Sequence, residues 1–143
     1  MDKIKVLFIC IHNSARSQMA EEFLRKYGGG RFDVESAGLE PGVINPLVVE
    51  ILKEDGIDIS GKKPISVMAK FKAGKTYQYT ITVCDKSVED RCPFFPGVSR
   101  RLNWPFSDPS TVKGTEAEKM EKIRVIRDQI RNKVKEFIDI TNA

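Results

Sequence analysis

An apolar run, a short polar loop and an amphipathic helix follow one another near the start of the chain, and this succession constrains the fold most. Residues 4–9 predict a buried strand, while apolar side chains from Met19 to Tyr27 recur at helical spacing. The loop between them reads Cys10-Ile11-His12-Asn13-Ser14-Ala15-Arg16-Ser17. A strand–loop–helix junction directs backbone N–H groups and the positive end of a helix dipole at one point, where an oxyanion is stabilised.

The side chains of this loop add chemistry to the predicted oxyanion site. A thiolate at Cys10 is favoured because helix N-termini and nearby cations lower thiol pKa values. Arg16 offers a planar fork that matches two oxygens of a tetrahedral anion, and Ser17 can donate its hydroxyl to the sulfur. The alternative is a core thiol and a surface arginine, but an arginine at the positive end of a helix is unfavourable without an anion. We therefore interpret the loop as a nucleophile inside an anion-binding cage. The backbone of the cage is formed by Ile11, His12, Asn13, Ser14, Ala15 and Arg16.

Length and composition exclude several other classes of protein. The 143 residues, 41% hydrophobic and 31% charged, predict one globular domain over residues 1–143. No apolar run is long enough for a signal peptide or a membrane span, which favours the cytoplasm and no membrane partner. The net charge of +4 attracts small anions, but basic and acidic residues are interspersed, so nucleic acid is not an expected partner.

Three cysteines without paired spacing and one histidine, His12, argue against a metal site. His12 is expected to contribute its backbone rather than its ring.

Strand and helix signals alternate along the rest of the chain. Alternating or β-branched sequence predicts further strands over residues 31–37, 79–83 and 99–104. Helices are predicted from Pro46, with Asn45 as the N-cap, and over residues 65–71. A last helix follows the capping box Thr115-x-x-Glu118. Its core-facing positions are Ile123, Ile126, Ile130, Val134 and Phe137. The alternation predicts an α/β fold with a central, mostly parallel, four-stranded sheet flanked by helices on both faces.

Three chemically useful side chains follow predicted strands. Cys10 and Cys84 come after the first and third strands, and Asp108 lies in the loop after the fourth. Ligands of such sheets bind beyond the carboxyl ends of the strands, so these residues can converge on one edge. Asp108 is a candidate general acid or base, although an aspartate before a proline, here Pro109, is also a common turn opener.

Cys84 and Cys92 enclose a segment without glycine or proline, in which Lys86 and Asp90 can pair as on a helix. If that segment is helical, the two Cα atoms lie about 12 Å apart, whereas a disulfide needs roughly 4.4–6.8 Å. Either the two cysteines never pair, or their pairing melts the segment.

The spacing Cys10-x5-Arg16-Ser17, the dipeptide Asp108-Pro109 and the alternating layout resemble the low-molecular-weight protein tyrosine phosphatase superfamily. Within it, the chain is similar to the thioredoxin-coupled arsenate reductases. The features that carry this second resemblance are Asn13-Ser14, Ser17-Gln18-Met19-Ala20-Glu21, Ser36-Ala37-Gly38, Cys84 and Cys92-Pro93. The match runs from about Lys5 to Pro109 and leaves only the last helix unspecific.

The resemblance implies roles for individual residues. Cys10 would attack the oxyanion, Arg16 would hold it, Ser17 would tune the sulfur and Asp108 would manage the proton. Asn13 would hold the shape of the loop, since asparagine tolerates positive φ.

The resemblance also implies a relay of disulfides and a set of partners. Arsenate would form an adduct on Cys10, Cys84 would release arsenite by forming a disulfide with Cys10, and Cys92 would carry the oxidation to thioredoxin. Phosphate would compete as an anion, and no cofactor is expected. Some such reductases bind potassium through residues matching Asn13, Glu21 and Ser36 and a downstream acidic residue. That position is Ile65 here, so no metal site is predicted.

Two other interpretations stay open at the level of sequence. A tyrosine phosphatase of the same fold would typically carry tyrosines after the Asp-Pro dipeptide, and this chain has Ser110-Thr111 there. A non-enzymatic anion-binding module would need the N–H groups and Arg16, but not Cys10, Ser17 and Asp108 together.

Overall fold

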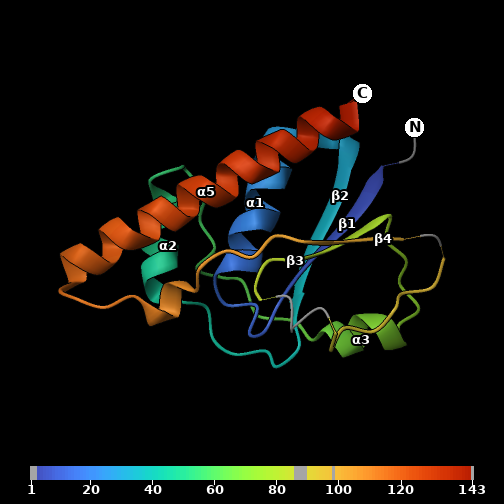
Figure 1. Cartoon of the computed structure of the whole chain (residues 1–143), viewed down its shortest axis with the longest axis horizontal. Helices are drawn as coiled ribbons and strands as arrows, with labels where there is room; N and C mark the ends of the chain where they lie inside the picture. The colour runs from blue at the N-terminus through green and yellow to red at the C-terminus, as the bar shows by residue number, and fades with distance from the viewer. Residues whose placement is uncertain (1–2, 86–89, 98, 143) are drawn as a thin grey trace.

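Four parallel strands form the centre of the molecule, in the spatial order β2-β1-β3-β4 (Figure 1). The computed structural model describes residues 3–85, 90–97 and 99–142. The strands are β1 (Ile4–Cys10), β2 (Phe32–Gly38), β3 (Tyr79–Thr82) and β4 (Arg100–Asn103). The predicted α/β fold around a four-stranded sheet is confirmed, and the sheet is parallel in all the pairings described. All four strands therefore end at the same edge.

The most apolar strand lies inside the sheet. Residues 6–9 of β1 are buried, and β1 is paired with β2 on one side and β3 on the other. At the edge of the sheet, β4 carries Arg100 and Arg101. Charged side chains on an edge strand discourage pairing with the edge of another molecule.

The helices follow the predicted pattern of caps and apolar faces. They are α1 (Arg16–Gly28), α2 (Pro46–Lys53), α3 (Val67–Lys72) and α5 (Glu116–Asn142), with 3-10 turns η1 (Gly29–Arg31) and η2 (Pro109–Thr111). Asn45 caps α2 by accepting a hydrogen bond from the N–H of Leu47 at 3.0 Å. Thr115 and Glu118 exchange two 3.1 Å hydrogen bonds before α5, so the predicted capping box is present. The five predicted core positions of α5 are buried.

Helices cover both faces of the sheet. On β2, Phe32 packs against Phe137 of α5 with ring centroids 6.0 Å apart, and α1 lies beside α5 on this face (Figure 1). Glu35 points to the opposite face, where it pairs with Lys70 of α3. The sheet is therefore enclosed, and its carboxyl edge is the open place for a ligand.

The helix predicted over residues 65–71 begins later, at Val67, and this boundary was wrong for a tertiary reason. The N–H of Ile65 donates to Asn13 Oδ1 at 3.0 Å, and its carbonyl accepts from the N–H of Gly38 at 2.8 Å. The Ile65 carbonyl therefore does not accept the first hydrogen bond of the helix from Ala69, and Ser66 becomes the N-cap by accepting from the N–H of Ala69.

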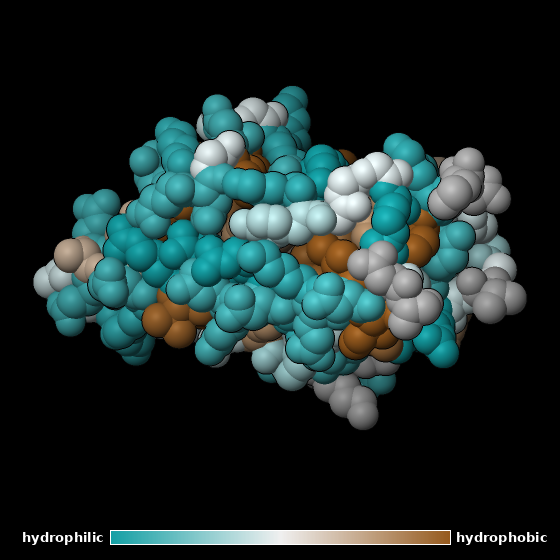
Figure 2. Space-filling view, turned by 90° about the horizontal axis from the view of Figure 1, so that it is seen from above, coloured by the Kyte–Doolittle hydropathy of each residue, from teal (hydrophilic) through white to brown (hydrophobic). Residues whose placement is uncertain are grey.

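The face seen from above is mainly hydrophilic and carries separate apolar patches (Figure 2). Among the described residues, none of the helices combines the length and the apolar character needed to cross a membrane. The predicted contact of Lys86 with Asp90, and the question of whether the segment between Cys84 and Cys92 is helical, depend on residues 86–89, which lie outside the described residues.

Candidate active site

The loop after β1 turns its backbone carbonyls outward. The carbonyls of residues 10, 11, 12 and 14 accept hydrogen bonds of 2.7–3.1 Å from backbone N–H groups of the segment 39–45. The carbonyl of Asn13 accepts from the side-chain amide of Gln18 at 3.0 Å. As a result, the N–H groups of residues 12–16 have no acceptor within the described part of the chain. No side chain caps α1 either, so these donors are left for an anion.

Asn13 holds this loop in shape. It has a φ of 54°, the only positive φ outside glycine among the described residues, as the resemblance implied. Its side chain is fully buried and donates to the hydroxyls of Ser17 at 2.7 Å and Ser36 at 3.0 Å. Because the Ser17 oxygen already accepts from Asn13, its proton is free for donation to another group, and the Cys10 sulfur is the predicted acceptor.

Gly38 lets the end of β2 approach the loop. A Cβ at this position would lie 2.8 Å from the backbone nitrogen of Asn13 and 2.8 Å from the carbonyl oxygen of Ile11. Both are backbone atoms of the cage and cannot move aside without deforming it. The glycine of the Ser36-Ala37-Gly38 motif is therefore a steric requirement of the anion site.

Cys10 is buried at the end of β1, and its surroundings favour the thiolate. A hydrogen bond from the Cys84 thiol is the main influence that lowers the pKa of Cys10. Burial opposes it, while the Arg16 charge and the backbone N–H of Ile11 add to it, so that the pKa falls to about 7. The hydrogen bond with Cys10, together with burial, raises the pKa of Cys84 well above its usual value. Near neutral pH Cys10 is therefore partly ionised, and in that state the pair holds a thiolate on Cys10 and a thiol on Cys84.

Arg16 is buried and held in place at the rim of the cage. Its Nη1 donates to the carbonyl of Phe106 at 3.0 Å, and its Nη2 lies 3.6 Å from Asp108 Oδ2. The other Asp108 oxygen accepts from both the N–H and the hydroxyl of Ser110, at 2.9 and 2.8 Å. Asp108 is thus both a turn opener, as the cap of η2, and a neighbour of the cage. Its interpretation as a turn opener is confirmed, and its role as a general acid or base stays a prediction.

Behind the loop lies a buried ionic cluster centred on Glu21. Ser36 donates a hydrogen bond to the Glu21 carboxylate, and Arg25 and Lys62 form ion pairs with it at 2.6 and 2.9 Å. Burial raises the pKa of Glu21, but Lys62, Ser36 and Arg25 outweigh it, so that its pKa lies below the usual value. These residues do not fit a potassium ion, because the Lys62 ammonium already neutralises Glu21. In addition, the position beside Asn13 that would need an acidic side chain is occupied by the apolar Ile65. Within the described residues, no group of three or more His, Cys, Asp or Glu side chains could hold a metal ion.

We expect Lys62→Met to lower the free energy of unfolding at neutral pH by about 1–3 kcal/mol, because it leaves a buried carboxylate short of a partner. The pKa of Glu21 is lowered in the folded state, so the stabilisation is present above about pH 4.3 and is lost as the pH falls further. Urea denaturation at neutral and acidic pH measures the difference. Lys63→Met, at an exposed neighbour without an ion pair among the described residues, is the matched control. Equal effects of the two changes would contradict the role given to Lys62.

The remaining predicted residues lie around the cage. His12 is exposed, and its ring Nδ1 lies 2.9 Å from the carbonyl of Glu40; its contribution to the cage through the backbone stays a prediction. Cys92 is buried in the segment 90–97, next to Arg91, which pairs with Glu40 at 3.0 Å. Gln18, Lys62 and the Phe106 carbonyl support the cage without having been predicted. Of these, Gln18 offered a signal, since it is a polar residue beside the core positions Met19 and Ala20.

A buried thiolate and an arginine around a strand–loop–helix cage define a cysteine-dependent class of oxyanion-binding enzyme. The model of the family described as low molecular weight phosphotyrosine protein phosphatase matches residues 5–142, and the chain belongs to this family. An arsenate reductase of Halalkalibacterium halodurans is 37% identical over 139 residues, which cover 97% of this chain and 98% of the relative.

Solved structures agree with this assignment. An arsenate reductase in the phosphate binding state has a TM-score of 0.76 at 29% identity, covering 95% of this chain and 97% of that one. A thioredoxin-dependent arsenate reductase of Corynebacterium glutamicum has a TM-score of 0.67 at 34% identity, covering 97% of this chain and 63% of that one. The family and the fold predicted from the sequence are confirmed.

Proposed function

We propose that this chain is a single-domain arsenate reductase over residues 1–143, which converts arsenate to arsenite and is recycled by thioredoxin. The observation that carries the proposal is the closeness of the Cys84 thiol to Cys10: it donates to the carbonyl of Ile9, the residue before Cys10, at 3.8 Å, and the two thiols shift each other's pKa. A phosphatase needs one nucleophilic cysteine, whereas a reductase needs a second sulfur within reach of the first. Relatives over the full length of the chain are arsenate reductases, and the phosphate-bound neighbour supports an oxyanion in the cage.

The first step places arsenate in the cage of N–H groups, held by the Arg16 fork. The Cys10 thiolate attacks arsenic, an As–O bond breaks, and the oxygen leaves as water after accepting a proton from Asp108. Ser17 donates its hydroxyl to the sulfur and tunes it. Phosphate has the same shape and charge, so it competes for the same donors.

The second step transfers two electrons. The Cys84 thiolate attacks the Cys10 sulfur, the S–As bond breaks, and its electron pair stays on arsenic, which leaves as arsenite with a Cys10–Cys84 disulfide behind. The pKa values of Cys10 and Cys84 determine when Cys84 can attack. While Cys10 is a thiolate it keeps Cys84 protonated. Once the sulfur is bonded to arsenic its charge is gone, and Cys84 then loses its proton more readily.

The last steps restore the enzyme. The Cys92 thiolate attacks Cys84, a Cys84–Cys92 disulfide forms, and the Cys10 thiolate is released. A thioredoxin dithiol then reduces that disulfide, as the name of the Corynebacterium neighbour suggests for that protein. Such a relay suits the reducing cytoplasm, where transient catalytic disulfides are the usual kind.

The decisive test is arsenate-dependent NADPH oxidation in the presence of thioredoxin and thioredoxin reductase, beside hydrolysis of an aryl phosphate by the same protein. We expect saturable arsenate turnover that inorganic phosphate inhibits, and only weak hydrolysis of the ester. The residues after Asp108-Pro109 are Ser110 and Thr111, which offer no aromatic ring to pack on that of a substrate. Their hydroxyls instead donate to Asp108. Strong ester hydrolysis without arsenate turnover would make the protein a phosphatase instead.

A further inference from the structure

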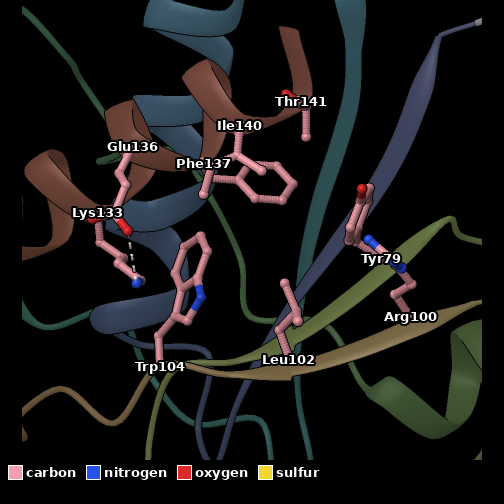
Figure 3. A pocket seen from close by; sticks show the side chains of 9 residues that line it. All are labelled: Tyr79, Arg100, Leu102, Trp104, Lys133, Glu136, Phe137, Ile140 and Thr141. Carbon is pink, nitrogen blue, oxygen red and sulfur yellow. Dashed lines mark hydrogen bonds and ion pairs between the residues drawn. The ribbon is translucent and has the colours of Figure 1, made fainter. Parts of the chain in front are cut away.

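A hollow of about 260 Å³ lies between the edge strand β4 and the last turns of α5, apart from the anion cage (Figure 3). Its walls are mainly apolar, with Tyr79 and Leu102 from the sheet and Phe137 from α5. The strand register aligns Arg100, at its mouth, with Tyr79 and Val6. Val6 precedes Cys10 by four positions, which is about 13 Å along a strand. A molecule at this mouth would therefore not compete for the Cys10 loop.

Hydrogen-bond donors without partners surround this apolar space. Among the described residues, no hydrogen bond or ion pair engages the guanidinium of Arg100, which is exposed, the hydroxyl of Tyr79 or the indole N–H of Trp104. Trp104 is only 7% exposed, and its side chain lines the hollow. In Figure 3, Arg100 and Tyr79 stand side by side at one end, and Trp104 lies at the other end near Lys133. Lys133 is engaged over the Trp104 ring at 5.8 Å and with Glu136 at 3.4 Å, so Arg100 is the cation of the lining for which the described part of the chain supplies no anionic partner.

We propose that this hollow binds a small aromatic carboxylate. An apolar cavity of about 150 Å³ accepts benzene, so 260 Å³ holds one ring with a short acidic arm. The ring would lie against Phe137 and Leu102, in an environment that suits aromatic contacts. The carboxylate would accept hydrogen bonds from Arg100 and Tyr79, and a ring hydroxyl would accept from the Trp104 N–H. A few placed donors in a concave apolar site are typical of small-molecule binding.

The test uses the full-length reduced protein and 4-hydroxyphenylacetate as the probe, with saturating inorganic phosphate to occupy the Cys10 loop. Trp104 is the only tryptophan, so a single indole N–H resonance in a ¹H–¹⁵N spectrum reports on the hollow. We expect a saturable shift of that resonance. The neutral amide of the probe should bind about tenfold more weakly, because it lacks the charge-assisted hydrogen bonds to Arg100.

Two arginine variants separate this site from a general attraction of anions. Arg100→Gln should weaken binding of the carboxylate about tenfold while changing that of the amide by less than about twofold. Arg101→Gln removes the same charge from the next residue, which stacks on Phe94 at 4.1 Å, and should leave both affinities unchanged. Leu102→Phe, which fills the hollow, should abolish both shifts. An unsaturable shift, or equal losses in the two arginine variants, would overturn the proposal.

Discussion

Replacing Cys10 by serine is expected to abolish both arsenate reduction and ester hydrolysis, with a loss of at least about 10⁴-fold in turnover. The Cys84 thiol, and to a lesser degree Arg16 and the backbone N–H of Ile11, bring the pKa of Cys10 to about 7. A serine hydroxyl stays protonated under the same conditions and is a poor nucleophile. Both activities begin with attack by this one atom, so they should disappear together in the coupled thioredoxin assay and in the aryl phosphate assay.

The same variant should still bind oxyanions, and this distinguishes lost chemistry from a lost fold. The N–H groups of residues 12–16 and the Arg16 fork are unchanged, so phosphate should still shift their amide resonances. Cys92→Ser is a matched control, since it makes the same substitution at a buried cysteine outside the cage and should leave ester hydrolysis intact. Hydrolysis by Cys10→Ser at more than about 1% of the wild-type rate would contradict a Cys10 nucleophile.

Much of the fold was predictable because its signals are local in sequence. The apolar run before Cys10 gives β1, and Asn45-Pro46 and Thr115-x-x-Glu118 mark the starts of helices through caps that involve neighbours in the chain. The cage is local too, since Cys10 and Arg16 lie six positions apart. Its position at the carboxyl edge follows from parallel strands alone.

The residues that hold the cage in place were less predictable, because they come from distant parts of the chain. The Phe106 carbonyl and Arg16 are separated by 90 positions, and Lys62 lies 41 positions after Glu21. Nothing in the local sequence marks a carbonyl or a lysine for such a contact. The late start of α3 has the same origin, since Ile65 is engaged by Asn13 and Gly38. Local propensity gave the helix, and tertiary hydrogen bonds set its boundary.

The second large effect is expected at Cys84. Cys84→Ser and Cys84→Ala should stop thioredoxin-linked arsenate turnover, by at least about 10³-fold, because no sulfur remains to displace arsenite from Cys10. Cys92→Ser should stop multiple turnover as well, but should still release one equivalent of arsenite per enzyme with a Cys10–Cys84 disulfide. Rapid-quench detection of arsenite and non-reducing peptide mapping measure these outcomes. Full turnover by either Cys84 variant would contradict the relay.

The Cys84 variants should also differ from each other in a way that tests the paired thiols. The hydrogen bond from Cys84 is the main influence that lowers the pKa of Cys10. Cys84→Ala removes this donor, so the midpoint of Cys10 alkylation against pH should rise from about 7 towards the ordinary thiol value near 8.5. Cys84→Ser keeps an O–H donor and should stay closer to the wild-type midpoint, and Cys92→Ser should not move it.

Because the thiolate is the nucleophile, ester hydrolysis by Cys84→Ala should fall at pH 7 and recover towards pH 9. If the alkylation midpoints of the wild type and Cys84→Ala coincide, the Cys84 thiol does not activate Cys10, and Arg16 and the loop N–H groups are sufficient.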